Sequence, residues 1–470
     1  MEFKIKNIGI IKDSTILLDG LTVVTGANNS GKSTVGKALY SSIEGLNNLG
    51  GKRSQEIRAI FLTTLREITM ALSLDEIARY IDEDKIDESL KVSFYLLAGQ
   101  GYRAVSKQIG VVEQYEKIKE LLNILSPDYF YSIINRPRSD LPKKWQAYLK
   151  NFDFTKDKAL RILANIEDVM YDEGYIKFSK ISVMNLFSKE FKGQIYPTKG
   201  IDKEKRSKVS LSKNGDIAFD FSIVGKQIIN ANKIFNKLFY NNAILIDDPY
   251  VIDNSISEFE MQYRFFSNKV DYSHNKKISR LLFGEDTSTA IEDYINNRNC
   301  KEIIDEISKI LPGNIVEKNG ALFYTENNSE PLSVENLATG SKIFSIIKTL
   351  LEKGAINYDT MLILDEPEAH LHPEWQNIMS EIIVLLVKKL GVNILLTTHS
   401  INFLLALETY MHKYAIEDIT HFYSTEYVDE QKYMVNYKCV DNSIHEIYDN
   451  LSYPYDSMVL KKFDITNKEE

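Results

Sequence analysis

The chain has 470 residues, of which 44% are hydrophobic and 26% are charged, and its formal net charge is -9. A chain of this length is larger than one hydrophobic core usually supports. Its two cysteines are too few for a disulfide framework. Its negative net charge argues against a surface covered by nucleic acid. No apolar run could span a bilayer and no cationic leader follows Met1, so we expect a cytoplasmic protein with an elaborated insertion and no membrane contact.

A glycine-rich loop follows the first strongly apolar run of the chain. Residues 21–25, an apolar run, and residues 35–40, a helix-like run, flank a segment with the spacing G-x-x-x-x-G-K-[ST], which is the strand, loop and helix context of a phosphate-binding loop. In this context Lys32 neutralises phosphate oxygens and the Ser33 hydroxyl is a ligand for Mg²⁺. The alternative is an ordinary glycine-rich turn, which the flanking pattern disfavours. The predicted phosphate-binding residues are Gly26, Ala27, Asn28, Asn29, Ser30, Gly31, Lys32, Ser33 and Thr34.

The long region from residue 40 to about residue 235 contains no further nucleotide motif. Helical periodicity recurs over residues 57–72, 108–125 and 158–170. Prolines interrupt the periodic segments and no heptad register persists, which disfavours a long coiled-coil arm and favours a compact lobe. We therefore expect a mainly helical insertion over residues 46–235, with a strand-like alternation at 217–223.

Strand-like sequence returns after the insertion. The apolar residues 243–246 precede Asp247, Asp248 and a proline, and this order imitates the acidic strand end of a nucleotide site. No strand that ends in histidine follows directly, so we interpret Asp247 as a structural strand end that borders the nucleotide. Helices are expected over residues 254–311 and a hairpin over 315–324.

Two later strands end in residues suited to nucleotide hydrolysis. The apolar run 361–364 ends in Asp365 and Glu366, and the apolar run 393–398 ends in His399. Asp365 is placed to hold the Mg²⁺ shell, and Glu366 is placed to polarise the water that attacks a γ-phosphate. Alone, an acidic pair at a strand end is equally common on a solvated sheet edge. The glycine-rich loop earlier in the chain favours the nucleotide interpretation.

The ordered set of motifs resembles the ABC-type ATPase head shared by SMC/RecF-like repair proteins and the overcoming-lysogenization-defect (OLD) family. The resemblance implies an α/β fold, namely an ABC-type P-loop ATPase head with a mixed sheet and flanking helices, formed by residues 1–45 and 236–470. Residues 364–373 resemble the extended Walker B motif, and His399 matches the switch histidine that reads the γ-phosphate. The first strands resemble the small antiparallel sheet that opens such heads. ATP and Mg²⁺ are the implied cofactors.

The same resemblance implies a signature loop that begins a helix before Walker B and meets the nucleotide of a partner subunit. The best match is residues 336–342, with Ala338, Thr339, Gly340 and Ser341 as the phosphate-facing residues. Ala338 departs from the family pattern, which has a serine, so Thr339 or Ser341 would supply the hydroxyl. Gly340 fits because a backbone that approaches phosphate closely needs a residue without Cβ. A homodimer or higher oligomer with shared ATP sites is therefore implied.

The segment after the switch histidine distinguishes members of this group. It is predicted to form a helix at 401–407 and a hairpin from 421–424 and 433–437. A Toprim nuclease needs a glutamate and an Asp-x-Asp strand end, and this segment provides no such set. The resemblance therefore points to a stand-alone ATPase, a sensor or switch that controls a separate effector protein in bacterial anti-phage defence. Two alternatives stay open. One is a RecF-type DNA-repair ATPase whose insertion grips DNA, and the less well matched one is an ABC transporter motor subunit.

Several polar features outside the motifs have two interpretations. The basic clusters at 136–145 and 203–208 either serve nucleic acid or a partner, with arginines beside a tryptophan suited to phosphates and a stacked base, or form a solvated surface. His370 and His372 are interpreted as part of a loop that faces the partner subunit rather than as a zinc site. For the glutamine that links nucleotide to the helical region, Gln100 is the one candidate, and a solvated glutamine is the alternative.

Overall fold

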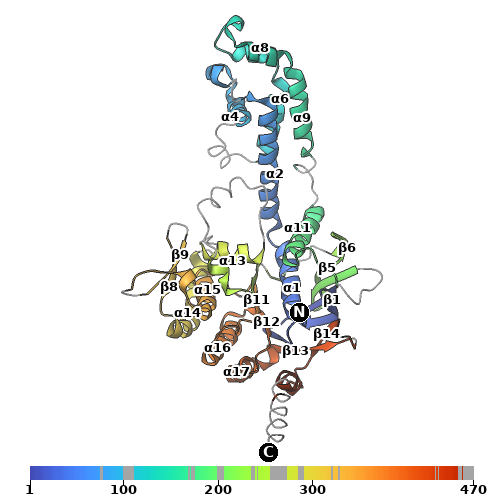
Figure 1. Ribbon diagram of the computed structural model, residues 1–470, viewed down its shortest axis with the longest axis vertical. Helices are drawn as coiled ribbons and strands as arrows, with labels where there is room; N and C mark the ends of the chain where they lie inside the picture. The colour runs from blue at the N-terminus through green and yellow to red at the C-terminus, as the bar shows by residue number, and fades with distance from the viewer. Residues whose placement is uncertain are drawn as a thin grey trace, which may run out of the picture. The chain divides into compact units, whose positions relative to one another are not determined.

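The computed structural model contains two compact units (Figure 1). The first unit, the head, takes in the described residues of 1–49, 176–261 and 271–470, and the second, the lobe, takes in those of 50–175. The structure describes residues 1–74, 78–98, 111–167, 170, 175–197, 206–233, 239–240, 242–253, 273–283, 290–318, 321–326, 329–428, 430–431, 433–453 and 458.

The described part of the head is built on a mixed sheet of eleven strands, in the order β6-β5-β4-β1-β2-β14-β13-β3-β12-β11-β7 (Figure 1). Five neighbouring strands, β13, β3, β12, β11 and β7, run parallel, whereas β2, β1, β4, β5 and β6 pair antiparallel with one another. The strands are β1 (Glu2–Ile8), β2 (Ile11–Leu17), β3 (Leu21–Thr25), β4 (Arg206–Lys213), β5 (Asp216–Val224), β6 (Gln227–Lys233), β7 (Asn242–Ile246), β11 (Thr360–Asp365), β12 (Asn393–Thr398), β13 (Thr420–Tyr427) and β14 (Val435–Cys439).

The helices of the head begin and end at recognisable sequence signals. His372 caps α16, Pro373 occupies its first turn, and Gly391 ends it with a φ of +66°. Ser400 accepts a hydrogen bond from the backbone N–H of Phe403 at the start of α17. The helices are α1 (Lys32–Leu46), α11 (Tyr175–Glu190), α13 (His274–Leu282), α14 (Ala290–Ile310), α15 (Thr339–Glu352), α16 (Pro373–Leu390) and α17 (Ile401–Lys413).

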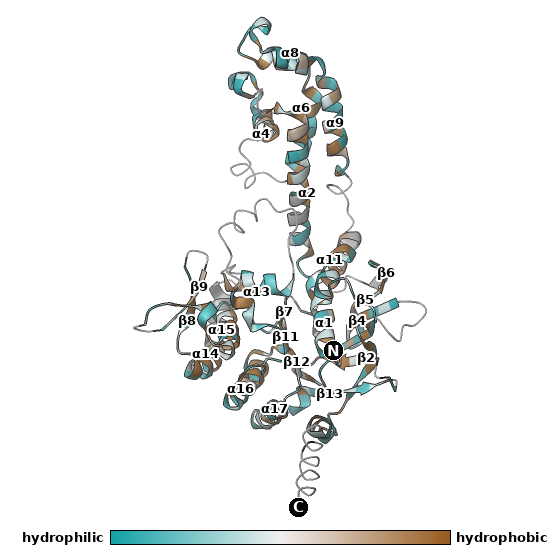
Figure 2. Cartoon of the chain, in the orientation of Figure 1, coloured by the Kyte–Doolittle hydropathy of each residue, from teal (hydrophilic) through white to brown (hydrophobic). Residues whose placement is uncertain are grey.

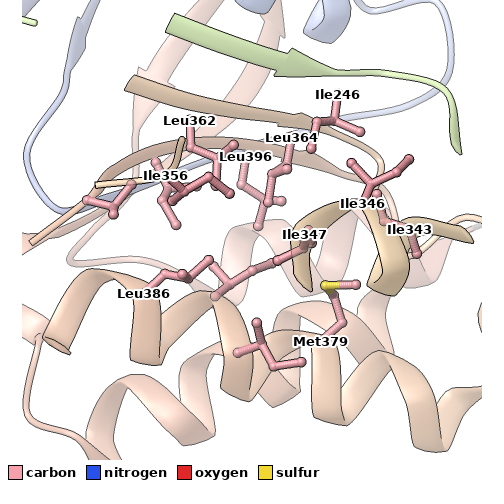
Figure 3. Close-up of a cluster of buried hydrophobic side chains, with 14 of the residues drawn as sticks. Ile246, Ile343, Ile346, Ile347, Ile356, Leu362, Leu364, Met379, Leu386 and Leu396 are labelled. Carbon is pink, nitrogen blue, oxygen red and sulfur yellow. The ribbon is translucent and has the colours of Figure 1, made fainter. Parts of the chain in front are cut away.

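The parallel strands are buried on both faces. Because alternate side chains of a strand point to opposite faces, Leu362 and Leu364 of β11 belong to one core, whereas Met361 and Ile363 belong to the other. Figure 3 shows the first core, where the strand leucines lie against α15 and against Met379 of α16. Burial on both faces explains why these strands are continuous apolar runs in the sequence.

The chain returns to the head earlier than the sequence indicated. A mainly helical insertion over residues 46–235 was expected, but the lobe ends at Tyr175 and α11 belongs almost entirely to the head. β4 pairs with β1 and carries β5 and β6, so residues 206–233 extend the main sheet. The alternation at 217–223 correctly predicted a strand, here β5. A strand pattern does not specify which sheet the strand joins, and this is why the boundary was misplaced.

Both predicted hairpins are present. β8 (Asn314–Lys318) and β9 (Ala321–Thr325) pair antiparallel, and β10 (Leu332–Ser333) adds a short third strand to this small sheet. β13 and β14 also pair antiparallel, but β13 in addition pairs parallel with β3, with Phe422 opposite Val23. The last two strands therefore lie inside the main sheet, next to the strand that precedes the glycine-rich loop.

The lobe has a hydrophobic core of its own. Phe94, Tyr115, Phe130 and Phe152 are fully buried in it, and Figure 2 shows that its helices carry both hydrophilic and hydrophobic residues. Its helices are α2 (Leu49–Leu72), α4 (Glu88–Leu97), α6 (Val111–Ile124), α7 (Pro127–Ile133), α8 (Lys143–Lys150) and α9 (Phe152–Ala164). Across the described residues of both units, no helix is both long and apolar enough to cross a membrane.

Candidate functional site

The glycine-rich loop connects β3 to α1, as the sequence predicted. Gly31 has a φ of +81°, in the left-handed region that glycine tolerates best, and a Cβ added to it would lie 3.0 Å from Cγ1 of Ile10. A Cβ added to Gly26 would collide with the hydroxyl of Thr425. The loop backbone is therefore packed too tightly at both ends for any residue other than glycine.

Lys32 points back into the loop. Its side chain is 4% exposed, and its ammonium donates hydrogen bonds to the carbonyl oxygens of Gly26 (3.0 Å) and Ala27 (3.1 Å). Nζ also lies 3.2 Å from Oε1 of Glu366. Burial of an ammonium is unfavourable unless it is paired, and here the carboxylate of Glu366 supplies the counter-charge.

Strand register places the predicted hydrolytic residues at one edge of the sheet. β12 lies between β3 and β11, with Thr398 opposite Thr25 and Thr397 opposite Asp365. Because the three strands are parallel, their carboxyl ends meet at the same edge. Asp365, Glu366 and His399 therefore lie beside the glycine-rich loop, although the two sequence motifs are more than three hundred residues apart.

Glu366 contacts both Lys32 and His399 through one oxygen atom. Oε1 lies 3.2 Å from Nζ of Lys32 and 3.0 Å from Nδ1 of His399. The backbone of Glu366 has a φ of +51°, and its N–H donates to the carbonyl oxygen (3.1 Å) and the hydroxyl (3.0 Å) of Thr397. The hydroxyl of Thr397 in turn donates to Asp365. Thr397 thus orients both acidic residues.

Glu368 is a functional candidate that the sequence analysis did not single out. It is 3% exposed, accepts a hydrogen bond from the hydroxyl of Thr398, and lies 3.4 Å from the backbone N–H of His399. Burial raises the pKa of this carboxyl group. Glu368 holds the end of β12, and thereby His399, against the segment that follows β11. The second glutamate of the Asp-Glu-Pro-Glu run was the available signal.

Tyr437 of β14 braces the glycine-rich loop from the C-terminal side. Its hydroxyl donates to the carbonyl oxygen of Ser30 at 3.1 Å, and burial raises its pKa, so the phenol stays neutral. The hydroxyl of Ser30 is buried and has no hydrogen-bond partner among the described residues. No sequence motif pointed to Tyr437, because its contact with the loop depends on the position of β14 in the sheet.

Helix α15, which begins in the predicted signature loop, is attached to a neighbouring segment of the head. Thr339 Oγ1 lies 2.9 Å from the hydroxyl of Tyr250, in η4 (Pro249–Asp253), and Ala338 is exposed at the helix start. Gly340 is buried, and a Cβ there would meet Leu371 at 3.0 Å and the ring of Trp375 at 3.3 Å. Packing within the chain therefore accounts for Gly340, a reason the sequence analysis did not consider. Ser341 is buried as well.

The acidic end of β7 lies next to Asp365. Ile246 is opposite Leu364 in the parallel pair, so Asp247 follows at the same edge as Asp365. Asp247 lies 2.7 Å from Nε2 of His274 and 3.5 Å from Nζ of Lys37. These contacts agree with the interpretation of Asp247 as a strand end and show that its charge is paired within the chain.

His274 is the centre of a buried charge cluster. Its Nδ1 lies 2.6 Å from Glu190 of α11, and its Nε2 contacts Asp247. Burial alone would lower the pKa of His274, but hydrogen bonds to Asp247 and Glu190 outweigh it and raise the pKa to about 9. Burial alone would raise the pKa of Asp247, but the hydrogen bond from His274 and the charges of His274 and Lys37 together outweigh it, so this pKa is lowered.

The structure argues against one of the two interpretations of the basic cluster at 136–145, stacking of a base on its tryptophan. Trp145 is 5% exposed and belongs to the lobe core, so it cannot stack on a base, and Arg138 lies over the ring of Tyr131 at 3.9 Å. Gln100 and residues 203–205 lie outside the described part of the chain. His370 and His372 are exposed, and the described residues contain no group of three or more His, Cys, Asp or Glu that could hold a metal ion.

Comparison with protein families shows the family of the chain. A family model described as "AAA domain, putative AbiEii toxin, Type IV TA system" matches residues 21–406, which is most of the chain. The chain belongs to this AAA family. The sequence predicted an α/β fold with an ABC-type P-loop head. This prediction is confirmed by the mixed sheet of this AAA family member and by the loop between β3 and α1.

Solved structures of SMC heads also resemble the chain. The SMC head domain from Thermotoga maritima has 9% sequence identity and a TM-score of 0.32, with 93% of this chain and 97% of that chain covered. An Smc head domain with an extended coiled coil, derived from Pyrococcus furiosus and bound to the C-terminal domain of ScpA, has 11% identity, a TM-score of 0.30 and 98% coverage of both chains. With TM-scores this low, the family assignment depends on the sequence match alone. No curated protein matches the chain.

Proposed function

We propose that this AAA family member binds ATP with Mg²⁺ at the carboxyl edge of β3, β12 and β11 and hydrolyses it. One observation carries the proposal: Oε1 of Glu366 contacts both Lys32 and His399, within 3.2 Å and 3.0 Å. A candidate phosphate-binding lysine and a candidate γ-phosphate reader thus both contact the candidate general base.

The residues present fit a nucleotide and its metal ion. The loop has little room for a Cβ at Gly26 or Gly31, which packs its backbone closely, and the hydroxyl of Ser30 is buried there without a partner in the described chain. The exposed Ser33 and the neighbouring Asp365 supply the oxygen ligands that Mg²⁺ prefers. A bound Mg²⁺ neutralises charge on the phosphate oxygens.

Lys32 and Glu366 exchange partners in the proposed cycle. Lys32 leaves the loop carbonyls and Glu366 to neutralise phosphate oxygens, which carry more negative charge than one carboxylate. The carboxylate of Glu366 then keeps His399 as its contact and is available to accept a proton from the attacking water. Thr397 holds the backbone of Glu366 throughout, so the base does not have to be repositioned.

The proposed site is shared between two chains, with α15 of one chain facing the P-loop of the other. Ala338, exposed at the start of α15, offers a test that Gly340 does not, because a larger side chain at Gly340 would clash within its own chain. Ala338→Asp introduces a charge that repels phosphate, while aspartate remains a favourable residue at a helix start. Ala338→Asn is the neutral control of the same shape.

Mixing experiments test the shared site. Lys32→Ala and Ala338→Asp should each be inactive alone, and mixing them should restore about a quarter of the wild-type ATPase activity, because half of the dimers then contain one intact site. Ala338→Asn should be active without mixing. If tagged, purified mixed dimers of the two inactive variants show no activity, the site is not shared in this way.

The proposed role of ATP turnover is to control a separate effector protein in anti-phage defence. The family description, which names a toxin–antitoxin system, supports a role beside a second protein. The chain purified alone should leave plasmid, linear duplex and RNA intact in the presence of ATP and Mg²⁺ or Mn²⁺. Cleavage that copurifies with the protein and survives Lys32→Ala would contradict this role, and ATP-dependent DNA binding would favour the RecF-type alternative.

A further inference from the structure

The start of α15 lacks a hydroxyl at position 338 but has a tyrosine from another segment beside it. The hydroxyl of Tyr250 lies 2.9 Å from Oγ1 of Thr339, the first residue of α15. Tyr250 is 48% exposed, whereas Thr339 is partly buried. The phenol is therefore the more accessible of the two hydroxyl groups at this helix end.

Tyr250 is held in place from two sides. Its backbone N–H donates to Asp248 at 2.8 Å, which fixes the turn after β7. The ammonium of Lys342 lies 4.7 Å from the centre of the tyrosine ring, a favourable cation–π contact. Lys342 is 2% exposed and is itself fixed by Asp253, at 2.5 Å and 2.7 Å from the two carboxylate oxygens. Because the half-exposed side chain of Tyr250 is already fixed, it loses little conformational entropy when it contacts another molecule.

The hydrogen bond between the two hydroxyl groups uses only one of their two protons. Tyr250 and Thr339 each carry one hydroxyl proton, and a single hydrogen bond between them uses only one of the two. When Thr339 is the donor, the phenol proton of Tyr250 is free to bond to an acceptor outside the chain. The N-terminus of α15 adds partial positive charge at the same place, and no acidic residue lies in the first turn of the helix.

We propose that the Tyr250 phenol supplies the hydroxyl that Ala338 lacks and donates a hydrogen bond to the nucleotide bound by the partner chain. This inference rests on the proposed shared ATP site. It assigns the phosphate contact to Tyr250 rather than to Thr339 or Ser341, and it gives Thr339 the role of orienting the phenol. Lys342 and Asp253 are positioning residues, because Lys342 fixes the ring and the two charges are paired with each other.

A purely structural role predicts a different outcome. If Tyr250 only fastened η4 to α15, Tyr250→Phe and Thr339→Val would break the same hydrogen bond and would lower kcat to the same extent. If the phenol contacts phosphate, Tyr250→Phe removes that contact, whereas Thr339→Val removes only the group that orients the phenol. Tyr250→Phe isolates the hydroxyl because it keeps the ring over Lys342.

The test uses tagged, purified mixed dimers in which one chain carries Lys32→Ala, so that a single P-loop is intact. The dimer of Lys32→Ala with wild type sets the baseline. Placing Tyr250→Phe in the Lys32→Ala chain should lower kcat by about 10- to 100-fold, the range expected for a hydrogen bond to a charged transition state. Placing Tyr250→Phe in the other chain should leave kcat at the baseline.

The outcomes distinguish this inference from the proposed function. Equal losses in both placements, or no loss in either, overturn the role of Tyr250, whereas the mixed dimers of Lys32→Ala and Ala338→Asp test the shared site independently. If those dimers are inactive, the shared site is overturned and the inference with it. Thr339→Val in the Lys32→Ala chain should lower kcat less than Tyr250→Phe does. An equal loss would show that the hydroxyl only fastens η4 to α15, and a larger loss would assign the contact to Thr339, so either result contradicts the proposal.

Discussion

The ammonium of Lys32 lies 3.2 Å from the carboxylate of Glu366, the residue that follows β11. In this arrangement the lysine that would bind phosphate and the glutamate that would activate water neutralise each other. In the proposed cycle nucleotide binding breaks this pair, so the carboxylate of Glu366 is released from the charge of Lys32 only after Lys32 has turned to the phosphates. Water activation is thereby linked to occupancy of the P-loop.

Lys32→Ala should lower ATP affinity by about 100-fold, because it removes the one buried ammonium of the loop that can bond to phosphate. Lys37→Ala is the matched control on the same helix, since Lys37 pairs with Asp247 instead. Titration calorimetry with a non-hydrolysable ATP analogue measures both. Equal losses from the two substitutions would show that α1 as a whole, rather than Lys32, determines affinity.

Tyr437→Phe should weaken nucleotide binding through the loop without touching the nucleotide. The substitution removes the hydrogen bond to the carbonyl oxygen of Ser30, so the unfolding free energy should fall by about 1 kcal/mol and the ATP affinity by several-fold. Tyr423→Phe is the control, because the Tyr423 hydroxyl accepts from the N–H of Leu17, away from the loop. Urea unfolding should show similar losses of stability for both variants. An equal loss of ATP affinity in Tyr423→Phe would contradict a specific brace.

His274 should make stability depend on pH in the alkaline range. Its pKa is raised from 6.5 to about 9 by Asp247 and Glu190, with Lys37 paired to Asp247 and the ring of Tyr40 at its edge. The native state therefore binds the proton more tightly than the unfolded chain. The stabilisation is fully present below pH 6.5 and is lost as the pH rises through about 9.

His274→Gln provides the comparison for this prediction, because glutamine can hydrogen-bond but does not titrate. The difference in unfolding free energy between wild type and His274→Gln should be largest below pH 6.5 and should shrink as the pH approaches and passes about 9. Denaturant unfolding at a series of pH values measures it. A difference that stays constant across this range would show that His274 is neutral in the folded protein.

The sequence predicted those parts of the site that local patterns encode. Lys32 follows a spaced glycine loop, and Glu366 and His399 each follow an apolar strand, so their shared edge could be inferred from parallel pairing alone. Tyr250 and Tyr437 could not be found in this way. Their contacts depend on where η4 and β14 pack, and neither carries a motif.

The fold was predictable to the same extent. The parallel strands, both hairpins and the helical lobe follow from periodicity. β4 and β6 were not predicted, and the attachment of β4 to β1 depends on pairing between residues such as Phe3 and Leu211, far apart in the chain. Gly340 illustrates a related limit. Its motif position suggested phosphate contact, but the structure shows a close approach to Leu371 and Trp375, and the sequence cannot distinguish these two reasons for a glycine.

The central claim, that Glu366 activates water for ATP hydrolysis, is tested most directly by Glu366→Gln. Single-turnover hydrolysis and the oligomeric state should be measured together with ATP and Mg²⁺, with the exposed Glu374→Gln as control. Glutamine keeps the shape but cannot accept the proton, so ATP should bind, remain intact and hold the protein as a dimer, while Glu374→Gln hydrolyses ATP normally. Hydrolysis by Glu366→Gln at the wild-type rate would contradict the account.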